Sequence, residues 1–429
     1  MPARPPELVG VGVLAVALLV VILWAAVLRE RGDDLRVFSA PFFGLWRYRL
    51  RVGFAAPIAL GALVIAYGRA VAERLGWRTA LLASWAATAV WSISLSAATG
   101  WSGLTRSLRS PYDYAPVLPV LHRLGAGSFI RNYVADLGRY PTHVKSHPPG
   151  MVLTLRILEL VGLRGTGWAA PALIALAAST TAAVALVVAR LADRTCARGL
   201  LPFLVCSPWT LLVATSADGL YAATVAWSVA LLAVAATTAP SPRASAVAVG
   251  AGLLVGCSLY FSYGLVPLAA ALVLAVLTRT ARWRLAVPVI TGVIAVASAW
   301  SLAGFDWLAG LSAARGFYAE GVARSRPYSY FLVANLVVFG VMVGPATVAA
   351  LSRRLEPRVA GLVAAAIAAV AIADVSGLSK GEVERIWLPF VPFVMVALVG
   401  LGRRPGARSW IAAQAATAVA LQLLIVWPW

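Results

Sequence analysis

The chain has few charged residues and few of the residues that bind metals or form disulfides. Only 12% of its 429 residues are charged and 61% are hydrophobic, whereas about a quarter of an ordinary soluble domain is charged. The three cysteines, Cys196, Cys206 and Cys257, lack the spacing of a zinc site or a disulfide framework. This composition excludes an ordinary soluble protein and a disulfide-stapled one.

Acidic residues are also scarce, at 16 against 36 lysines and arginines, which gives a formal net charge of +20. Most arginines fall in short clusters between apolar runs, as residues that set membrane topology do. We therefore expect contact with membrane lipids and not with nucleic acid. No glycine-rich phosphate loop is present, so no nucleotide-sugar site is expected.

What the chain has in abundance is apolar runs long enough to cross a hydrocarbon core of about 30 Å. Such runs must be helical, because lipid offers no partners for backbone groups. We expect an all-α, polytopic transmembrane bundle with about thirteen spans, at residues 8–28, 53–72, 79–99, 169–190, 199–216, 219–238, 245–262, 263–278, 285–304, 328–350, 359–377, 386–402 and 409–427. The first run is interpreted as a retained helix and not a signal peptide, because no clear cleavage site follows it.

Four short loops carry the arginines that orient the bundle: 190–198, 279–284, 353–358 and 403–408. On this trace they share one side, which the positive-inside rule makes the cytoplasm, with the C-terminus outside. The arginine-rich loop 29–52 falls on the other side. Either that loop lies at the outer surface, or one of the first two helices is misassigned.

Residues 100–168 are expected to form one large external loop. Its apolar stretch 151–163 is too short to cross a bilayer. Arg156 and Glu159 are three residues apart and so share one face of a helix. We expect an interfacial helix that lies along the membrane surface.

All three histidines, His122, His143 and His147, lie in this loop. The stretch "YPTHVKSHPPG" (140–150) holds the last two together with Lys145, and all three side chains could hold a phosphate. Its two prolines favour the start of a helix. A basic interfacial anchor is the alternative.

Acids on the same side could do chemistry. In "RSPYDYAPV" (109–117), Asp113 lies between Tyr112 and Tyr114, where a carboxylate could remove a proton from an acceptor hydroxyl; a turn-forming Asp is the alternative. In "TSADGLYAA" (215–223), Asp218 needs a cation or a hydrogen-bond network if buried, or it caps the following helix.

The stretch "SKGEVERIWLPFVPF" (379–393) holds Glu382, Glu384 and Arg385 at the start of a late span. The fixed fork of Arg385 suits a phosphate; a charge that merely reaches toward the membrane surface is the alternative. No acid lies clearly at the middle of a span, which argues against a transport path.

With these residues in order, the chain resembles the C-type membrane glycosyltransferases, and more narrowly the branch of protein O-mannosyltransferases and aminoarabinose transferases. That branch ends its first external loop in His-Pro-Pro-Leu or Lys-Pro-Pro-Leu, where this chain has His147-Pro148-Pro149-Gly150. Asp113, Asp218 and the series Glu382, Arg385, Pro389 match by order and side. The resemblance covers about residues 79–402, which would form the catalytic core; 1–78 would add two N-terminal helices and 403–429 a last one.

The resemblance implies transfer of a sugar from a polyprenyl-phosphate donor to an acceptor on the external face of the cell membrane, with inversion. Asp113 would be the general base. Lys145, His147 and Arg385 would hold the donor phosphate, and the supporting residues would be His143, Asp218, Glu382, Glu384 and Tyr112. The expected sugar is of the mannose or arabinofuranose type, the expected acceptor a lipid or glycan, and the process cell wall biogenesis.

The chain departs from that branch where protein O-mannosyltransferases carry an Asp-Glu pair, because Tyr114 follows Asp113 here. A single carboxylate does not support a divalent metal at that point, and no other cofactor is expected. The alternatives are a flippase or other transporter of lipid-linked glycans, an enzyme like the O-antigen ligases, and a membrane protein without catalysis.

Overall fold

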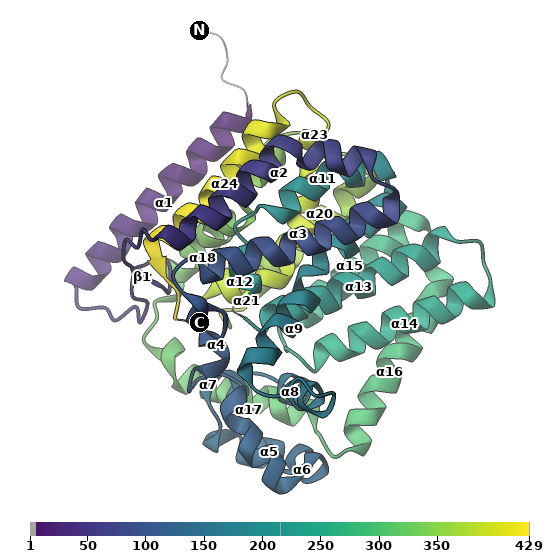
Figure 1. The fold of residues 1–429 in the computed structure, drawn as a ribbon. Helices are drawn as coiled ribbons and strands as arrows, with labels where there is room; N and C mark the ends of the chain where they lie inside the picture. The colour runs from purple at the N-terminus through teal and green to yellow at the C-terminus, as the bar shows by residue number, and fades with distance from the viewer. Residues whose placement is uncertain (1–5, 215, 429) are drawn as a thin grey trace.

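The computed structural model describes residues 6–214 and 216–428, and helices account for nearly all regular structure in these residues. Nine helices in this part of the chain are long and apolar enough to cross a membrane, or ten if a bent pair counts as one span. The architecture is that of an all-α polytopic membrane protein, with long helices packed side by side and a lobe of short ones at one end (Figure 1).

The first half of the chain begins with long helices and then forms the short helices that make most of the lobe. The long elements are α1 (Pro6–Glu30), η1 (Val52–Phe54), α2 (Ala55–Arg74) and α3 (Trp77–Ala97). The short elements that follow are η2 (Trp101–Leu104), α4 (Arg106–Arg109), η3 (Ala115–Val117), α5 (Leu118–Leu124), α6 (Ala126–Asp136), η4 (Leu137–Arg139), α7 (Thr142–Lys145) and α8 (Gly150–Leu160).

The middle of the chain supplies the centre of the bundle and one flank. Its elements are α9 (Thr166–Ala178), α10 (Thr180–Leu191), α11 (Arg194–Val205), α12 (Thr210–Val213), α13 (Asp218–Thr237), α14 (Pro242–Leu259), α15 (Leu265–Thr280), η5 (Trp283–Leu285), α16 (Ala286–Leu302) and α17 (Trp307–Glu320). Helices α14 and α16 form the flank at the right of Figure 1.

The last third completes the bundle and ends in a short strand. Its elements are η6 (Val322–Arg324), α18 (Tyr328–Val343), α19 (Pro345–Leu351), α20 (Pro357–Val375), α21 (Val383–Ile386), η7 (Leu388–Phe390), α22 (Val391–Val394), η8 (Met395–Leu398), α23 (Val399–Gly402), α24 (Ala407–Leu424) and β2 (Ile425–Val426). Strand β2 pairs antiparallel with β1 (Leu45–Trp46).

The expected count of thirteen spans is not confirmed, because four of the expected segments differ from a long apolar helix. Segment 199–216 is broken between α11 and α12 at Cys206–Trp209. Segment 263–278 forms the 16-residue α15, and segment 328–350 bends by 106° between α18 and α19. The last segment forms α24, which is not among the nine.

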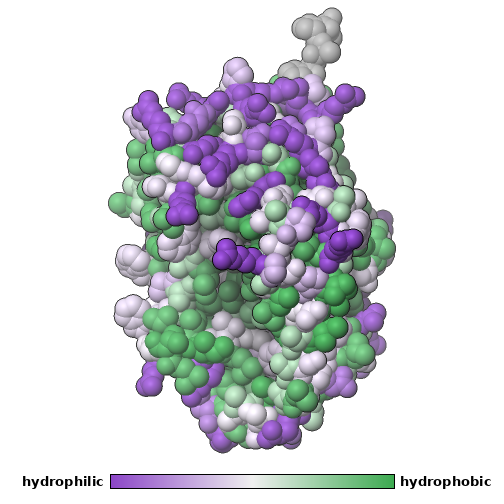
Figure 2. All heavy atoms as spheres, turned by 90° about the vertical axis from the view of Figure 1, so that its right-hand side faces the viewer, coloured by the Kyte–Doolittle hydropathy of each residue, from purple (hydrophilic) through white to green (hydrophobic). Residues whose placement is uncertain are grey.

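The four arginine loops gather at one end of the bundle, as their spacing predicts. We call loops 190–198, 279–284, 353–358 and 403–408 the cationic end. Arg358 pairs with Asp193 at 2.8 Å, and Arg279 donates to the carbonyl of Arg358. Arg404 Nη1 lies 3.7 Å from Glu7 Oε1, so the start of α1 lies at the same end. Figure 2 shows hydrophilic side chains crowded there, above an apolar band.

Loop 29–52 lies at the opposite end, beside the C-terminus, so both of the first two helices are in place. Its residues Arg47 and Arg49 donate backbone hydrogen bonds to the carbonyls of Leu424 and Leu423. The chain trace therefore shows the loop and the cationic end at opposite ends of the bundle, and the outer location of the loop stays a prediction.

The short helices of residues 101–160 form a lobe with α17, also at the end opposite the cationic end (Figure 1). Helix α8 begins at Gly150, directly after Pro148 and Pro149, as the prolines predict. Arg156 and Glu159 lie on one face of α8, with Arg156 Nη1 3.2 Å from Glu159 Oε2. His122 also binds Glu159, at 2.6 Å, so this histidine belongs to the packing of the lobe.

The sharp bend between α18 and α19 exposes backbone groups that the apolar interior cannot solvate. Gly344 adopts a φ of +84°, and α19 starts at Pro345. The buried side chain of Gln414 on α24 donates to the carbonyl of Val343 and accepts from the amide of Ala346. The side chain of Gln414 thus bonds to the facing ends of both helices, and the Thr347 hydroxyl gives the Val343 carbonyl a second donor.

We expect Gln414→Ala to destabilise the protein by about 1–3 kcal/mol, because the buried amide of Ala346 loses its acceptor. The carbonyl of Val343 loses one of two donors and keeps the Thr347 hydroxyl. The control is Thr417→Ala, whose hydroxyl only bonds back to Ala413 within α24. Unfolding midpoints in detergent measure both. Equal midpoints for the two variants would show that Gln414 does not hold the bend.

Candidate functional site

The candidate site lies where the lobe meets the ends of α13 and α21, and its centre is a buried ion pair. Arg385 Nη1 lies 3.0 Å from Asp218 Oδ2, and the two side chains are only 5% and 4% exposed. Asp218 is the first residue of α13, and Arg385 lies in α21, 167 residues later. The structure thus brings together two residues that the sequence placed in separate motifs.

The alternative interpretations are a helix cap for Asp218 and a charge that reaches toward the membrane surface for Arg385. Neither describes the contacts of these residues. Asp218 is the first residue of α13, after the N-cap Ala217, and its carboxylate binds Arg385 and the hydroxyl of Ser216. Arg385 is buried and does not reach to the surface. A pair enclosed in this way costs several kcal/mol in lost hydration, so it persists only with further partners.

Those further partners come from the turn before α21. Glu382 Oε2 lies 3.7 Å from Arg385 Nη2, and Glu382 Oε1 lies 3.4 Å from Arg326 Nη2. Glu382 adopts a φ of +62°, a conformation that costs a non-glycine residue free energy. Acids and arginines therefore alternate from Asp218 to Arg326, and the buried charges balance.

Arg326 is a residue that the sequence analysis did not single out, and it ties loop 29–52 to the site. Its guanidinium donates to the carbonyls of Leu35, Arg36 and Lys380. Nearby, the carboxylate of Glu384, which is fully buried, accepts from the amide of Phe43. The N-terminal loop is therefore part of the scaffold of the site.

The predicted base Asp113 is buried in the lobe, 4% exposed. Its Oδ1 accepts from the amide of the next residue, Tyr114, and its Oδ2 lies 3.4 Å from His143 Nδ1. The amide of His143 donates to the carbonyl of Tyr112, which fixes the two segments together. The Tyr112 ring itself is 63% exposed, so its backbone supports the site and its side chain does not.

Two buried tyrosines connect Asp113 to the ion pair. The hydroxyl of Tyr221 donates to that of Tyr114 at 3.1 Å. Burial, and next the charge of Asp218, raise the pKa of Tyr114 well above its ordinary value, so the phenol stays protonated. The charge of Asp113 raises that pKa further, and the charge of Arg385 lowers it. Tyr221 follows Asp218 by three residues, on the same helical face.

His147 packs between these tyrosines, with ring centroids 5.9 Å from Tyr114 and 6.2 Å from Tyr221. Desolvation by its neighbours lowers its pKa to about 4. Its Nδ1 lies 2.7 Å from the carbonyl of His143 and must therefore carry the proton. In the neutral ring Nε2 is then an acceptor, so His147 as a donor to phosphate remains a prediction that requires protonation.

Lys145 lies apart from this cluster. Its ammonium lies 5.4 Å from the centroid of the Phe317 ring, on α17. The structure thus brings Asp113, His143, His147, Asp218, Glu382 and Arg385 together, adds Glu384 behind them, and leaves Lys145 and the Tyr112 side chain outside. In the described part of the chain no three His, Cys, Asp or Glu side chains group as metal ligands would.

An apolar cavity of about 670 Å³ lies beside the cluster, among α14, α15, α16 and the start of α17, on the side that Figure 2 faces. Tyr260 lines it and accepts from the amide of Gly150, while Phe261 stacks on Tyr221. A Cβ at residue 150 would lie 2.3 Å from the Tyr260 carbonyl oxygen. Only glycine fits at residue 150 without a shift of this wall, because α8 starts against it.

Comparison of the chain with protein-family models, with curated proteins and with solved structures gives no match. Its contacts are accordingly the basis for any functional conclusion.

Replacement of Asp218 by Asn should destabilise the fold by about 3–5 kcal/mol, because Arg385 would keep its buried charge and lose its closest acid. The control is Asp136→Asn, which breaks a surface pair with Arg139 and should cost no more than about 1 kcal/mol. Chemical unfolding of both variants in detergent compares them. A loss for Asp218→Asn as small as that of the control would mean that the pair does not stabilise this end.

The lowered pKa of His147 predicts a pH dependence of stability. Between pH 6.5 and about 4 the unfolded chain binds a proton at this residue and the folded chain does not, so stability falls as pH falls through that window. In His147→Gln that part of the fall disappears. Unfolding midpoints from pH 4 to 7 measure it, and parallel profiles for the two proteins would contradict the assignment.

Proposed function

We propose that the chain is a membrane glycosyltransferase that moves a sugar from a polyprenyl-phosphate donor to a hydroxyl of a lipid or glycan acceptor. The observation that carries the proposal is that the buried guanidinium of Arg385, paired with Asp218, and the buried carboxylate of Asp113 belong to one cluster with Tyr114 and Tyr221. Tyr221 stacks on Phe261, the neighbour of Tyr260, which lines the apolar cavity. A lipid phosphate needs a cation and an apolar path for its chain, and we propose that the cluster supplies the cation and the cavity the path.

The reaction follows from what these groups can do. Asp113 accepts the proton of the acceptor hydroxyl, whose oxygen forms a bond to the anomeric carbon. The bond from that carbon to the phosphate oxygen breaks, and its electron pair leaves with the polyprenyl phosphate. Arg385, held by Asp218 and Glu382, stabilises the negative charge that develops on this phosphate. Attack opposite the leaving group inverts the anomeric centre.

Lys145 and His147 complete the proposed donor site if a bound phosphate draws them in. His143 lies where it would orient Asp113, and Glu384 holds loop 29–52 behind Arg385. The cationic end would face the cytoplasm by the positive-inside rule. Our proposal therefore includes an external location for this site, at the plasma membrane. The mannose or arabinofuranose class of donor is part of the same proposal.

Transport of lipid-linked glycans is the second candidate, and the buried charges at Asp218 and Arg385 could serve it too. It is less well supported, because the charges gather at one end of the bundle and not along a path through it. The two functions differ in outcome: an enzyme consumes the lipid-linked sugar, and a flippase leaves it intact.

Purified protein in lipid should transfer label from polyprenyl-phosphate mannose to an acceptor in a membrane glycolipid extract. Asp113→Asn should lower the rate by about 10²–10⁴-fold, the contribution of a general base. Asp136→Asn, another acid of the lobe, is the control. Full activity in Asp113→Asn would remove this residue as the base, and no transfer from any polyprenyl-phosphate sugar would overturn the proposed enzyme.

A further inference from the structure

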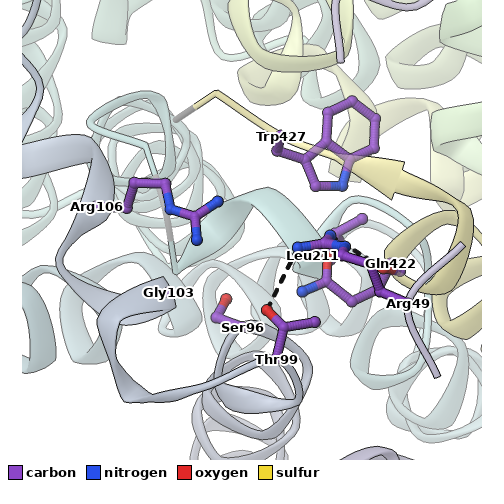
Figure 3. Close-up of a pocket in the computed structure, with 8 residues that line it drawn as sticks. All are labelled: Arg49, Ser96, Thr99, Gly103, Arg106, Leu211, Gln422 and Trp427. Carbon is purple, nitrogen blue, oxygen red and sulfur yellow. Dashed lines mark hydrogen bonds between the residues drawn. The ribbon is translucent and has the colours of Figure 1, made fainter. Parts of the chain in front are cut away.

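A second polar pocket lies at the same end of the molecule as the candidate site and shares no residue with it. Its walls come from three segments distant in sequence: Arg49 before α2, Ser96 and Thr99 at the end of α3 with Arg106 on α4, and Gln422 with Trp427 at the C-terminus (Figure 3). The proposed glycosyl transfer gives this pocket no role.

The charge of the pocket is entirely of one sign. In residues 6–214 and 216–428 no acid lies within ion-pair distance of Arg49 or Arg106. Burial, and next the charges of Arg106, Arg51 and Arg47, lower the pKa of the Arg49 guanidinium. A guanidinium that is partly desolvated among other cations is unfavourable unless an anion joins it.

Arg49 is nonetheless held firmly in this place. It donates to the carbonyl of Ile425 at 2.7 Å and more weakly to that of Gln422, and its Nη1 is 3.5 Å from the Thr99 hydroxyl (Figure 3). These contacts use the terminal nitrogens of the guanidinium. The Nε of Arg49 is buried and has no hydrogen-bond partner among the described residues.

Three further polar atoms around the pocket are buried and lack a partner in the described chain: the Ser96 hydroxyl, the indole Nε1 of Trp427 and Oε1 of Gln422. Their residues are at most 5% exposed. Buried groups of this kind are almost always paired in native proteins, with protein, water or a ligand. The Ser96 hydroxyl, the Trp427 indole and Arg49 Nε are hydrogen-bond donors. The pocket therefore offers mostly donors to a ligand.

The size of the pocket limits what can enter. Its enclosed space is about 20 Å³, room for about one water-sized group. A ligand can therefore insert one or two oxygens, while the rest of it stays at the mouth, where the exposed Arg106 lies. A phosphate group meets this requirement, because its oxygens are separate acceptors around one centre and its substituent can point outwards.

We propose that this pocket binds a phosphate group, held between the guanidinium groups of Arg49 and Arg106 with Ser96 and Trp427 as further donors. The phosphate comes either from the head group of an anionic lipid or from free phosphate in solution. This site is separate from the one around Arg385, and binding here needs no sugar transfer.

The test titrates delipidated protein in a neutral detergent with a short-chain phosphatidylglycerol and, separately, with inorganic phosphate. A ligand that binds the folded state raises the thermal unfolding midpoint in proportion to its occupancy. Sodium chloride at matched ionic strength corrects for screening. Native mass spectrometry counts the lipids that remain bound.

Arg106→Gln should weaken binding about tenfold or more, the loss expected for one charge-assisted hydrogen bond. Arg106 is exposed, so this variant keeps the fold. The matched control is Arg109→Gln on the same short helix, because Arg109 contacts Thr166 and does not line the pocket. Trp427→Phe, which removes one donor and keeps the ring, should weaken binding less.

Saturation by phosphatidylglycerol alone identifies a lipid head group, and saturation by both ligands identifies a site open to free phosphate; either supports the proposal. The proposal is overturned if Arg106→Gln and Arg109→Gln bind phosphatidylglycerol and phosphate with the same affinity. It is also overturned if sodium chloride raises the unfolding midpoint as much as these ligands do. Loss of glycosyl transfer in any assay does not bear on these outcomes, so the two proposals fail separately.

Discussion

The ion pair between Asp218 and Arg385 is the constraint on which the rest of this end of the molecule depends. The chain has few charges, and two of them are buried together here. The free energy that they lose by leaving water is offset only if neighbouring residues supply further hydrogen bonds and opposite charges. Glu382 and Arg326 extend the pair into a balanced network, and Arg326 in turn holds the carbonyls of loop 29–52. Loop 29–52 is thereby linked to Arg326, which lies 291 residues after Leu35.

The same need to satisfy polar groups in apolar surroundings decides where helices break. At the bend between α18 and α19, Gln414 bonds to Val343 and Ala346, and the Thr347 hydroxyl also donates to Val343. Between α11 and α12 the Trp209 indole donates to the carbonyl of Leu204, and the Thr210 hydroxyl to that of Ser207. These breaks shorten the helices. They account for part of the difference between the thirteen expected spans and the nine helices of the described residues that are long and apolar enough to cross a membrane.

Features set by local chemistry could be predicted from the sequence. Two prolines placed the start of α8, a spacing of three placed Arg156 beside Glu159, and the arginine loops came together at one end. The thirteen-span count is not confirmed, because hydropathy does not register a bend that a distant side chain such as Gln414 stabilises.

In the site, the sequence indicated Asp113, Asp218 and Arg385 as functional residues. It could not predict the ion pair between the last two, because that pair depends on how α13 packs against the segment that contains α21. Arg326 gave no signal, because a single arginine in a polar loop resembles any other surface charge. Lys145 was expected in the cluster, yet it lies against Phe317, since α17 packs on the lobe. Contacts between segments distant in sequence are the part that local patterns do not contain.

The central claim is that Arg385 faces a lipid phosphate while Asp113 faces the sugar. The most direct measurement is a cryo-electron microscopy structure of the protein in lipid nanodiscs with a non-hydrolysable phosphonate analogue of a polyprenyl-phosphate sugar. The account predicts phosphonate density within hydrogen-bonding distance of the Arg385 guanidinium, with the lipid chain in the cavity beside Tyr260 and the sugar toward Asp113. Density for the phosphonate at the cationic end, or on any face away from Arg385, would contradict it.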